Sequence, residues 1–98
     1  MKQYKTSTVF EKKLNKLRGT DLANVVKKVD EICLKDITHF KNLKYDLKQY
    51  KRVHVNDSFV ILFFDEKQVV HFVDYVHHDV AYKPGKKLLK KYKRLDFK

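Results

Sequence analysis

The feature that most constrains the fold is a series of three extended segments within residues 50–82. Residues 50–55 alternate between polar and apolar side chains, residues 58–64 are almost entirely apolar, and residues 68–76 are rich in β-branched and aromatic side chains. Alternation is typical of a half-buried strand, and an unbroken apolar run is typical of a central strand with both faces covered. Because the polar connections between these segments are short, we expect an antiparallel meander.

The alternation in the first of these strands separates its side chains onto two faces. Val53 and Val55 fall on one face, and Arg52 and His54 fall on the other. We expect the two valines to pack against helices, and Arg52 and His54 to line the opposite, open face of the sheet.

Two amphipathic helices are predicted before the meander. Apolar residues recur at helical spacing within residues 9–18 and again within residues 22–35, and Gly19 separates the two segments. Ser7 or Thr8 is expected to cap the first helix. The stretch before this cap is expected to be an edge strand, and the two helices are expected to form a hairpin with one shared apolar seam.

Residues 42–48 are predicted to form the first strand of the meander, and residues 86–95 a basic amphipathic helix after the Lys-Pro-Gly breaker at 83–85. This tail is either a docked helix or one that becomes ordered only with a partner. The predicted fold class is α+β, with an N-terminal strand and a two-helix hairpin packed on one face of a small, mostly antiparallel sheet. Residues 1–98 are expected to form a single domain.

Positive charge is the strongest global signal. The chain has 23 Lys and Arg residues against 12 Asp and Glu residues, a net charge of +11. Residues 83–98 alone carry eight basic side chains and one acidic one. Clustered basic charge favours a phosphate-bearing partner. With a lone cysteine, no signal peptide and no apolar run long enough to span a membrane, the sequence predicts a cytoplasmic protein that does not enter membranes.

The order of four short segments carries a family resemblance: FEKKLNKL in the first helix, FKNL before the meander, YKRVHVNDSFVILF within it, and HHDVAY at its end. Together they resemble the RelE/ParE toxin superfamily. The resemblance to its RelE-like branch implies a small ribonuclease that cuts messenger RNA, usually inside the ribosome. It also implies a cognate antitoxin that restrains the toxin, with the free toxin monomeric and the complex a hetero-oligomer.

The chain departs from the RelE pattern at three positions. Arginines are common in the family where this sequence has His54, Phe59 and His78. Phe59 removes a phosphate contact, whereas the two histidines keep polar chemistry at their positions.

Self-cleavage of RNA by its 2′-hydroxyl needs proton transfer and neutralisation of phosphate charge. Histidine suits the first task because its pKa lies near neutrality, and arginine suits the second because it stays ionised. His54 and His78 are therefore candidate acid–base residues, Arg52 is a candidate phosphate ligand, and Tyr82 is a candidate for stacking on a base. His77 is expected to be structural.

Lysines in the basic segments are candidate RNA ligands. They are Lys41, Lys48, Lys51, Lys83, Lys86 and Lys87. No cofactor and no metal ion are expected. His77 and His78 are adjacent in a predicted strand, so their side chains are expected to point to opposite faces rather than to share a metal.

Two alternatives remain open at the level of sequence. One is a ParE-type toxin that acts on DNA gyrase and needs no acid–base residues. The other is a family member that has lost catalysis and binds RNA only, which the phenylalanine at position 59 favours.

Overall fold

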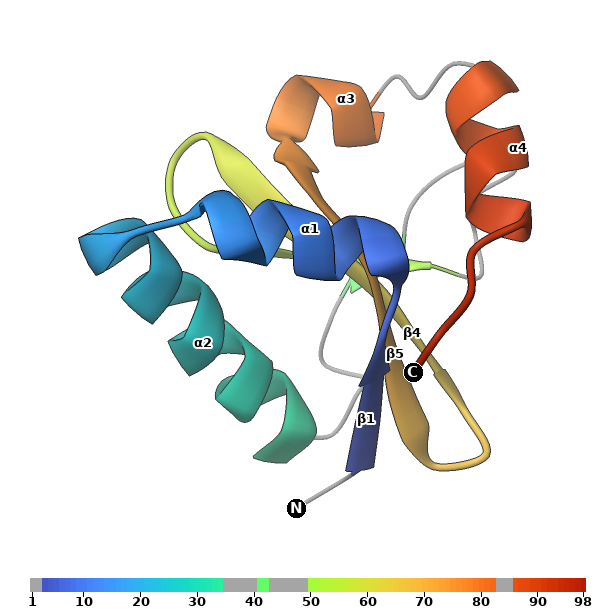
Figure 1. The fold of residues 1–98 in the computed structure, drawn as a ribbon, viewed down its shortest axis with the longest axis horizontal. Helices are drawn as coiled ribbons and strands as arrows, with labels where there is room; N and C mark the ends of the chain where they lie inside the picture. Colours follow the sequence, from blue (N-terminus) through green and yellow to red (C-terminus); the bar gives the residue numbers. More distant parts are fainter. Residues whose placement is uncertain (1–2, 35–40, 43–49, 83–85) are drawn as a thin grey trace.

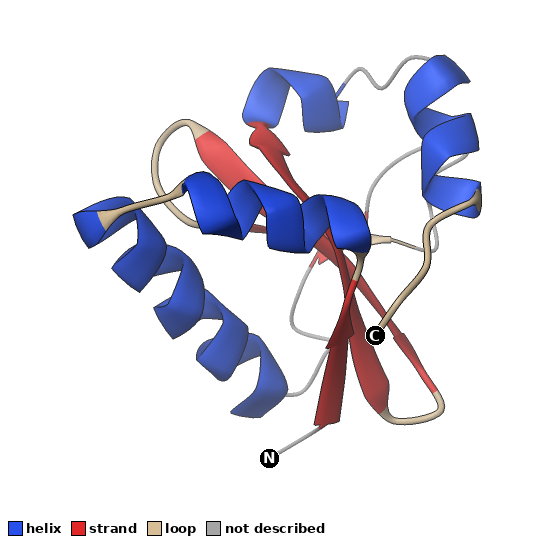
Figure 2. Ribbon diagram, viewed as in Figure 1, coloured by secondary structure: helices blue, strands red, loops and turns tan. Residues whose placement is uncertain are grey.

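The computed structural model describes residues 3–34, 41–42, 50–82 and 86–98, with the backbone alone described at 41–42, 82 and 86–89. The elements are β1 (Gln3–Thr6), α1 (Thr8–Lys16), α2 (Gly19–Leu34), β2 (Lys41–Asn42), β3 (Lys51–His54), β4 (Phe59–Glu66), β5 (Val69–His77), α3 (His78–Tyr82) and α4 (Lys86–Lys93). The strands form one sheet in the order β1-β5-β4-β3-β2. Only the β1–β5 pairing among these is parallel, so the mostly antiparallel α+β prediction is confirmed (Figures 1 and 2).

The first helix begins where the sequence predicted. Ser7 has an extended backbone, and its Oγ accepts a hydrogen bond from the Phe10 amide at 2.9 Å. This contact satisfies one of the amides that the first turn of a helix leaves without an intrahelical partner. α1 then lies across β5, with α2 running beside it, and both helices cover the same face of the sheet (Figure 1).

The core under this hairpin is apolar and closely packed. Phe10 of α1 stacks on Phe72 of β5 with ring centroids 5.5 Å apart, and Val25 and Ile32 bring α2 onto the same cluster. Val53 and Val55 pack against the cluster as predicted.

The meander is confirmed, with β4 as its central strand. Val60, Ile61, Leu62 and Phe63 are all 0% exposed, as expected for a strand covered on both faces. The β4–β5 connection is the pair Lys67 and Gln68, both at positive φ, as a two-residue hairpin turn requires.

The first meander strand is the two-residue β2, paired antiparallel with β3. The remainder of the predicted strand, residues 43–48, lies outside the described residues. The predicted turn before β4 is also present, because Asn56 Oδ1 accepts hydrogen bonds from the amides of Ser58 and Phe59 at 2.8 and 2.9 Å.

A second core covers the face that the sequence left open. Tyr92 of α4 is buried against this face together with Val60, Leu62 and Val73, and Leu95 and Phe97 pack beside them. The expectation of an open face is therefore wrong. It rested on the polar side chains of β3 alone, whereas β4 and β5 are apolar on this face as well and need a cover.

The last residues of the chain pair with the segment around the start of α1. Thr6 and Lys98 exchange backbone hydrogen bonds of 3.0 and 3.1 Å, and the Thr8 amide donates to the Asp96 carbonyl at 3.3 Å. Residues 96–98 are consequently fixed beside the start of α1.

Candidate functional site

Arg52 and His54 lie on the same face of β3, as their spacing predicted. Arg52 is opposite Leu62 of β4, and His54 is opposite Val60. Both of these β4 residues belong to the second core, so Arg52 and His54 face away from the helical hairpin.

The two side chains have different exposure. His54, the last residue of β3, is exposed, whereas Arg52 is half-buried and its Nη1 atom is fully buried. A large ligand therefore has direct access to the imidazole of His54. Access to the guanidinium of Arg52 is restricted to its outer atoms.

His78 is the first residue of α3, immediately after β5. Its amide donates to the Ser58 carbonyl at 2.8 Å, and its Nδ1 lies 3.0 Å from Oδ1 of Asp79. The side chain is 32% exposed. Contacts on the backbone and on the ring thus orient an imidazole that still reaches solvent.

His77 and His78 lie side by side, contrary to the sequence-based expectation. Their ring centroids are 4.4 Å apart. The physical reason is that β5 ends at His77 and the backbone turns into α3, so strand alternation no longer applies. Nitrogen and oxygen atoms of His77, His78 and Asp79 all lie within 4.8 Å of one another, a donor set that a divalent cation could use. The absence of a resident metal stays a prediction.

His54 ends β3 and His78 directly follows β5, and β4 lies between these two strands. Val60 pairs with both His54 and Val76, and His78 follows Val76 by two residues. Since neighbouring strands are about 4.8 Å apart, the two histidine backbones are on the order of 10 Å apart. This separation excludes direct contact between the two backbones, because β4 lies between them.

Within the predicted lysine set, Lys51 is the member whose side chain the structure describes. It pairs with Phe63, a residue of the core under the hairpin, so Lys51 and Arg52 alternate onto opposite faces of the sheet. Lys51 is half-buried.

The structure places the backbone of several other predicted residues. Tyr82 ends α3, Lys41 is in β2 opposite Arg52, and Lys86 and Lys87 begin α4. Lys48 and Lys83 lie outside the described residues.

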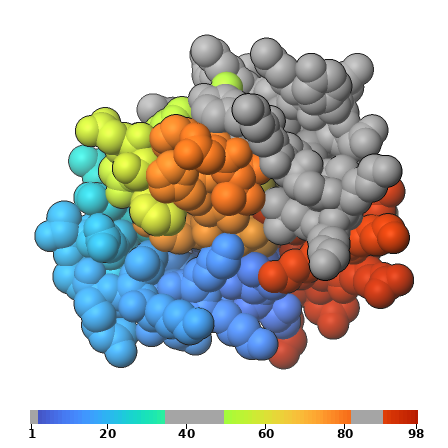
Figure 3. Space-filling model, turned by 90° about the horizontal axis from the view of Figure 1, so that it is seen from above, coloured from blue at the N-terminus to red at the C-terminus, as the bar shows by residue number. Residues whose placement is uncertain are grey.

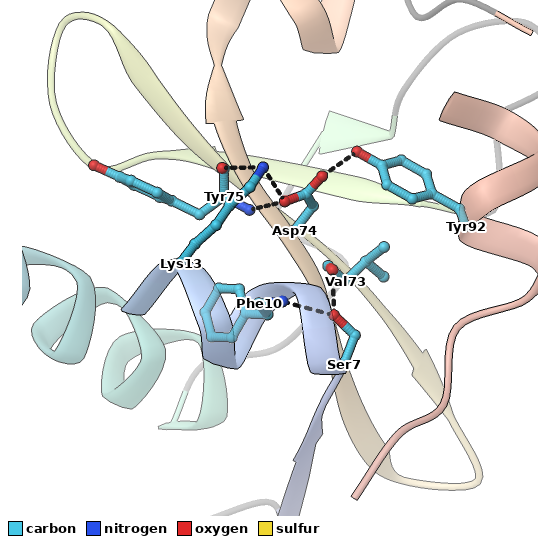
Figure 4. Close-up of polar contacts among 7 residues, drawn as sticks. All are labelled: Ser7, Phe10, Lys13, Val73, Asp74, Tyr75 and Tyr92. Carbon is cyan, nitrogen blue, oxygen red and sulfur yellow. Dashed lines mark hydrogen bonds and ion pairs between the residues drawn. The ribbon is translucent and has the colours of Figure 1, made fainter. Parts of the chain in front are cut away.

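A buried carboxylate that the sequence reasoning missed joins three elements of the fold. Asp74 of β5 is 1% exposed. Its Oδ1 accepts from Lys13 Nζ of α1 at 2.6 Å and from the Tyr75 amide at 2.8 Å, while its Oδ2 accepts from the Tyr92 hydroxyl of α4 at 2.8 Å (Figure 4). The sequence feature that could have revealed this network is an aspartate within the apolar run VVHFVDYV, because a charge inside a buried strand needs partners.

The local backbone of β5 is irregular at this point. The register of β4 and β5 shifts between Leu62 and Phe63, because Leu62 pairs with Asp74 and Phe63 with Phe72. Val73 is the extra residue of the resulting bulge, and its carbonyl accepts a 2.5 Å hydrogen bond from Ser7 Oγ. The α1 cap and the Asp74 network are thereby attached to adjacent residues of one strand.

Comparison with known proteins places this geometry in a family. No family model matches the chain. A Methanocaldococcus jannaschii protein named as a RelE-type toxin, RelE4, is 42% identical over 80 residues, which cover 80% of this chain and 83% of that protein. The chain belongs to the RelE toxin family.

Two solved structures share the fold. The toxin–antitoxin complex RelBE2 of Mycobacterium tuberculosis matches with a TM-score of 0.67 at 18% identity, over 78% of this chain and 90% of that one. YafQ of Escherichia coli matches with a TM-score of 0.60 at 17% identity, over 82% of this chain and 97% of that one.

Phe59 belongs to an aromatic cluster. Phe59 stacks on Tyr75 with centroids 5.0 Å apart, and the ring of His77 meets it edge-on at 5.6 Å. This RelE protein therefore has an aromatic surface at the position where the sequence-based resemblance led us to expect a missing phosphate contact. Any positive charge that binds phosphate at this end of the sheet must come from side chains other than residue 59.

Proposed function

We propose that this RelE-family toxin is an endoribonuclease that cleaves messenger RNA on the translating ribosome. The observation that supports the proposal is the position of His54 and His78 at neighbouring ends of β3 and β5 in a RelE fold, with both imidazoles accessible. Histidine side chains at such positions supply the proton transfers that RNA cleavage requires.

The proposed reaction is attack of the 2′-hydroxyl oxygen on the adjacent phosphorus. A new bond forms between these two atoms, and the bond from phosphorus to the 5′-oxygen of the next nucleotide breaks. One imidazole takes the proton of the 2′-hydroxyl, and the other gives a proton to the departing 5′-oxygen. The expected products are a 2′,3′-cyclic phosphate and a free 5′-hydroxyl, with no change in oxidation state.

The outer atoms of the Arg52 guanidinium are proposed to neutralise charge on the reacting phosphate. Arg52 shares its face of β3 with His54, which places the charge and one of the two imidazoles on the same side of the sheet. Preorganised positive charge of this kind stabilises a phosphorane-like transition state. Tyr82 is proposed to position the RNA base at the end of α3.

Primer extension on messenger RNA after induction of the toxin tests the activity, with DNA breaks followed in the same cells. We expect cuts within translated codons and no gyrase-dependent breaks. DNA breaks with intact messenger RNA would replace the proposal with a ParE-type action on gyrase. RNA binding without cuts would indicate a family member that has lost catalysis.

An antitoxin is the proposed protein partner. The Mycobacterium tuberculosis relative is the toxin of a toxin–antitoxin complex, and the net charge of +11 on this chain favours an acidic or amphipathic partner segment. Co-expression with the neighbouring reading frame and affinity purification should recover a stable hetero-oligomer. A toxin that is purified alone and is harmless on expression would contradict this expectation.

A further inference from the structure

A pocket of about 520 Å³ lies beside the proposed cleavage site and has no role in the reaction described above. It forms where α1, the loop after β3, the end of β5 and α3 meet, and Figure 3 shows the α1, loop and α3 surfaces adjoining at this end of the molecule. Its lining includes Lys16, Phe59, Tyr75, His77, Val80 and Lys91. The volume is within the range of roughly 300–1,000 Å³ that is typical of small-ligand sites.

One wall of the pocket is aromatic. Phe59 and Tyr75 are stacked with an interplanar angle of 14°, and Val80 beside them is 41% exposed although it is apolar. Burial and the nearby charge of Asp21 raise the pKa of the Tyr75 phenol, so its hydroxyl remains a hydrogen-bond donor well above neutral pH. A planar heterocycle with acceptor atoms matches such a wall.

The pocket lining has a net positive charge, because beyond the Lys13–Asp74 ion pair it holds two lysines, Lys16 and Lys91, and one carboxylate, Asp21. Lys13 is engaged by Asp74 at 2.6 Å and by the Tyr75 carbonyl at 3.0 Å, so its charge is already compensated. Lys16 and Lys91 are exposed, and neither has an ion-pair partner among the residues the structure describes. These two ammonium groups approach the pocket from α1 and α4, and a dianionic or monoanionic phosphate between them would be stabilised.

We propose that this pocket binds one nucleotide of the RNA, with the base against the Phe59–Tyr75 wall and its phosphate between Lys16 and Lys91. The inference rests on the proposed function, which supplies RNA as the ligand. Phe59 and Tyr75 pack on the hairpin side of the sheet, whereas His54 lies on the other face. The pocket lining also includes His77, whose ring centroid lies 4.4 Å from that of His78. The bound nucleotide is therefore placed next to one of the two proposed catalytic histidines, and its base selects where the RNA is cut.

Titration of the full chain with ribonucleoside 5′-monophosphates tests the proposal, in a His78→Ala background that avoids toxicity. Calorimetry gives the affinity, and amide chemical shifts give the location. The pocket variant is Lys16→Ala/Lys91→Ala. The matched control is Lys12→Ala/Lys27→Ala, which removes the same charge from exposed helix lysines that do not line the pocket.

We expect shifts at Phe59, Tyr75 and Val80, and a loss of affinity of roughly tenfold or more in the pocket variant, since charge-assisted contacts to phosphate are among the stronger hydrogen bonds. The control should lose less than about threefold, because it changes only the long-range field. Val80→Trp should fill the pocket and abolish binding without lowering the unfolding temperature appreciably, because Val80 is exposed.

Equal losses in the two double variants, or shifts confined to other surfaces, would overturn the proposal. Inorganic phosphate that binds as tightly as the nucleotides would overturn the base-recognition part, and tighter binding of an acidic peptide would assign the pocket to a protein partner instead. If mononucleotides bind in the pocket but the chain does not cleave RNA, only the proposed ribonuclease activity is refuted. If the chain cleaves messenger RNA but no nucleotide binds in the pocket, only the nucleotide-site proposal is refuted.

Discussion

Asp74 is a buried carboxylate on which several polar contacts of the interior converge. A carboxylate that is 1% exposed is costly to bury, and here the cost is offset by an ammonium, an amide and a phenol that converge on its two oxygens. Lys13, Tyr75 and Tyr92 come from three different elements. The network therefore fixes how α1 and α4 sit on β5.

Replacing Asp74 by alanine should destabilise the fold strongly. The change leaves the hydroxyl of Tyr92 without its acceptor and leaves the ammonium of Lys13 with only the Tyr75 carbonyl. Breaking a fully buried pair typically costs about 3–5 kcal/mol, and the 38% exposure of the Lys13 side chain lowers the expected cost below that range. Urea unfolding followed by circular dichroism measures the difference. Asp79→Ala is the control, because that carboxylate side chain is 77% exposed. A loss for Asp74→Ala below about 1 kcal/mol would contradict the role assigned to the network.

The proposed catalytic residues make a prediction of a different kind. His54→Ala and His78→Ala should each lower RNA cleavage by roughly 10²–10⁴-fold, the usual contribution of a general acid or base, and relieve growth arrest. Tyr82→Phe should also relieve it if the hydroxyl positions RNA. Each variant should keep its unfolding midpoint and its binding to the antitoxin. Undiminished toxicity in all three would remove the catalytic assignment.

At the scale of elements, Tyr92 is a buried aromatic side chain with a polar end that holds α4 on the sheet. Tyr92 is 3% exposed, contacts the ring of Tyr50 with centroids 5.9 Å apart, and donates to Asp74. Burial, followed by the charge of Asp74 and its hydrogen bond, raises the pKa of the Tyr92 phenol above its ordinary value of 10.0. Ionisation of this phenol is thus opposed in the folded state.

Tyr92→Phe should therefore change the response to alkali. The folded state holds the phenolic proton to higher pH than the unfolded state, so the contribution of Tyr92 is complete below about pH 10 and is lost as the pH rises beyond that value. We expect the wild type to exceed the variant by about 1.5–3 kcal/mol near pH 7, with the gap shrinking above pH 10. Tyr4→Phe, at a 50% exposed tyrosine, should show no comparable gap in urea unfolding from pH 7 to 11. A pH-independent gap for Tyr92→Phe would contradict the assignment.

The elements themselves were largely predictable, and their contacts were not. Helical spacing and the Ser7 cap located α1 and α2 to within a few residues, since both signals depend on local sequence alone. The apolar run of residues 58–64 already indicated that both faces of β4 are covered. Which segment covers the second face was not predictable, because the docking of α4 depends on tertiary contacts. Likewise, strand alternation separated His77 from His78, but the turn into α3 after β5 brings their rings together.

Part of the candidate site was predictable because it depends on local spacing within one strand. The shared face of Arg52 and His54 follows from a spacing of two residues in one strand. Partners from distant segments, such as Lys13 and Tyr92 on Asp74, arise from tertiary packing. A single sequence contains no local pattern for those contacts.

At the scale of the whole molecule, the net charge of +11 should make RNA binding strongly dependent on salt. Each phosphate contact to single-stranded RNA adds about 0.7 to the slope of log affinity against log salt. Lys83→Ala/Lys87→Ala should therefore reduce the slope by roughly 1.4, as measured by fluorescence anisotropy in a His78→Ala background. Lys5→Ala/Lys27→Ala, which lies outside the basic tail, should leave the slope nearly unchanged. Equal slopes for all forms would show that the tail does not contact RNA.

The pairing of residues 96–98 with Thr6 and Thr8 has a consequence for the synthesis of the protein. The strand pairing at the start of α1 is completed by residues that leave the ribosomal tunnel about ninety residues later. A nascent chain stalled with these residues still inside the tunnel should be cleaved readily by protease, whereas the released chain should resist. Until these residues have left the tunnel, the pairing beside α1 stays incomplete, so the chain becomes protease-resistant only after they emerge.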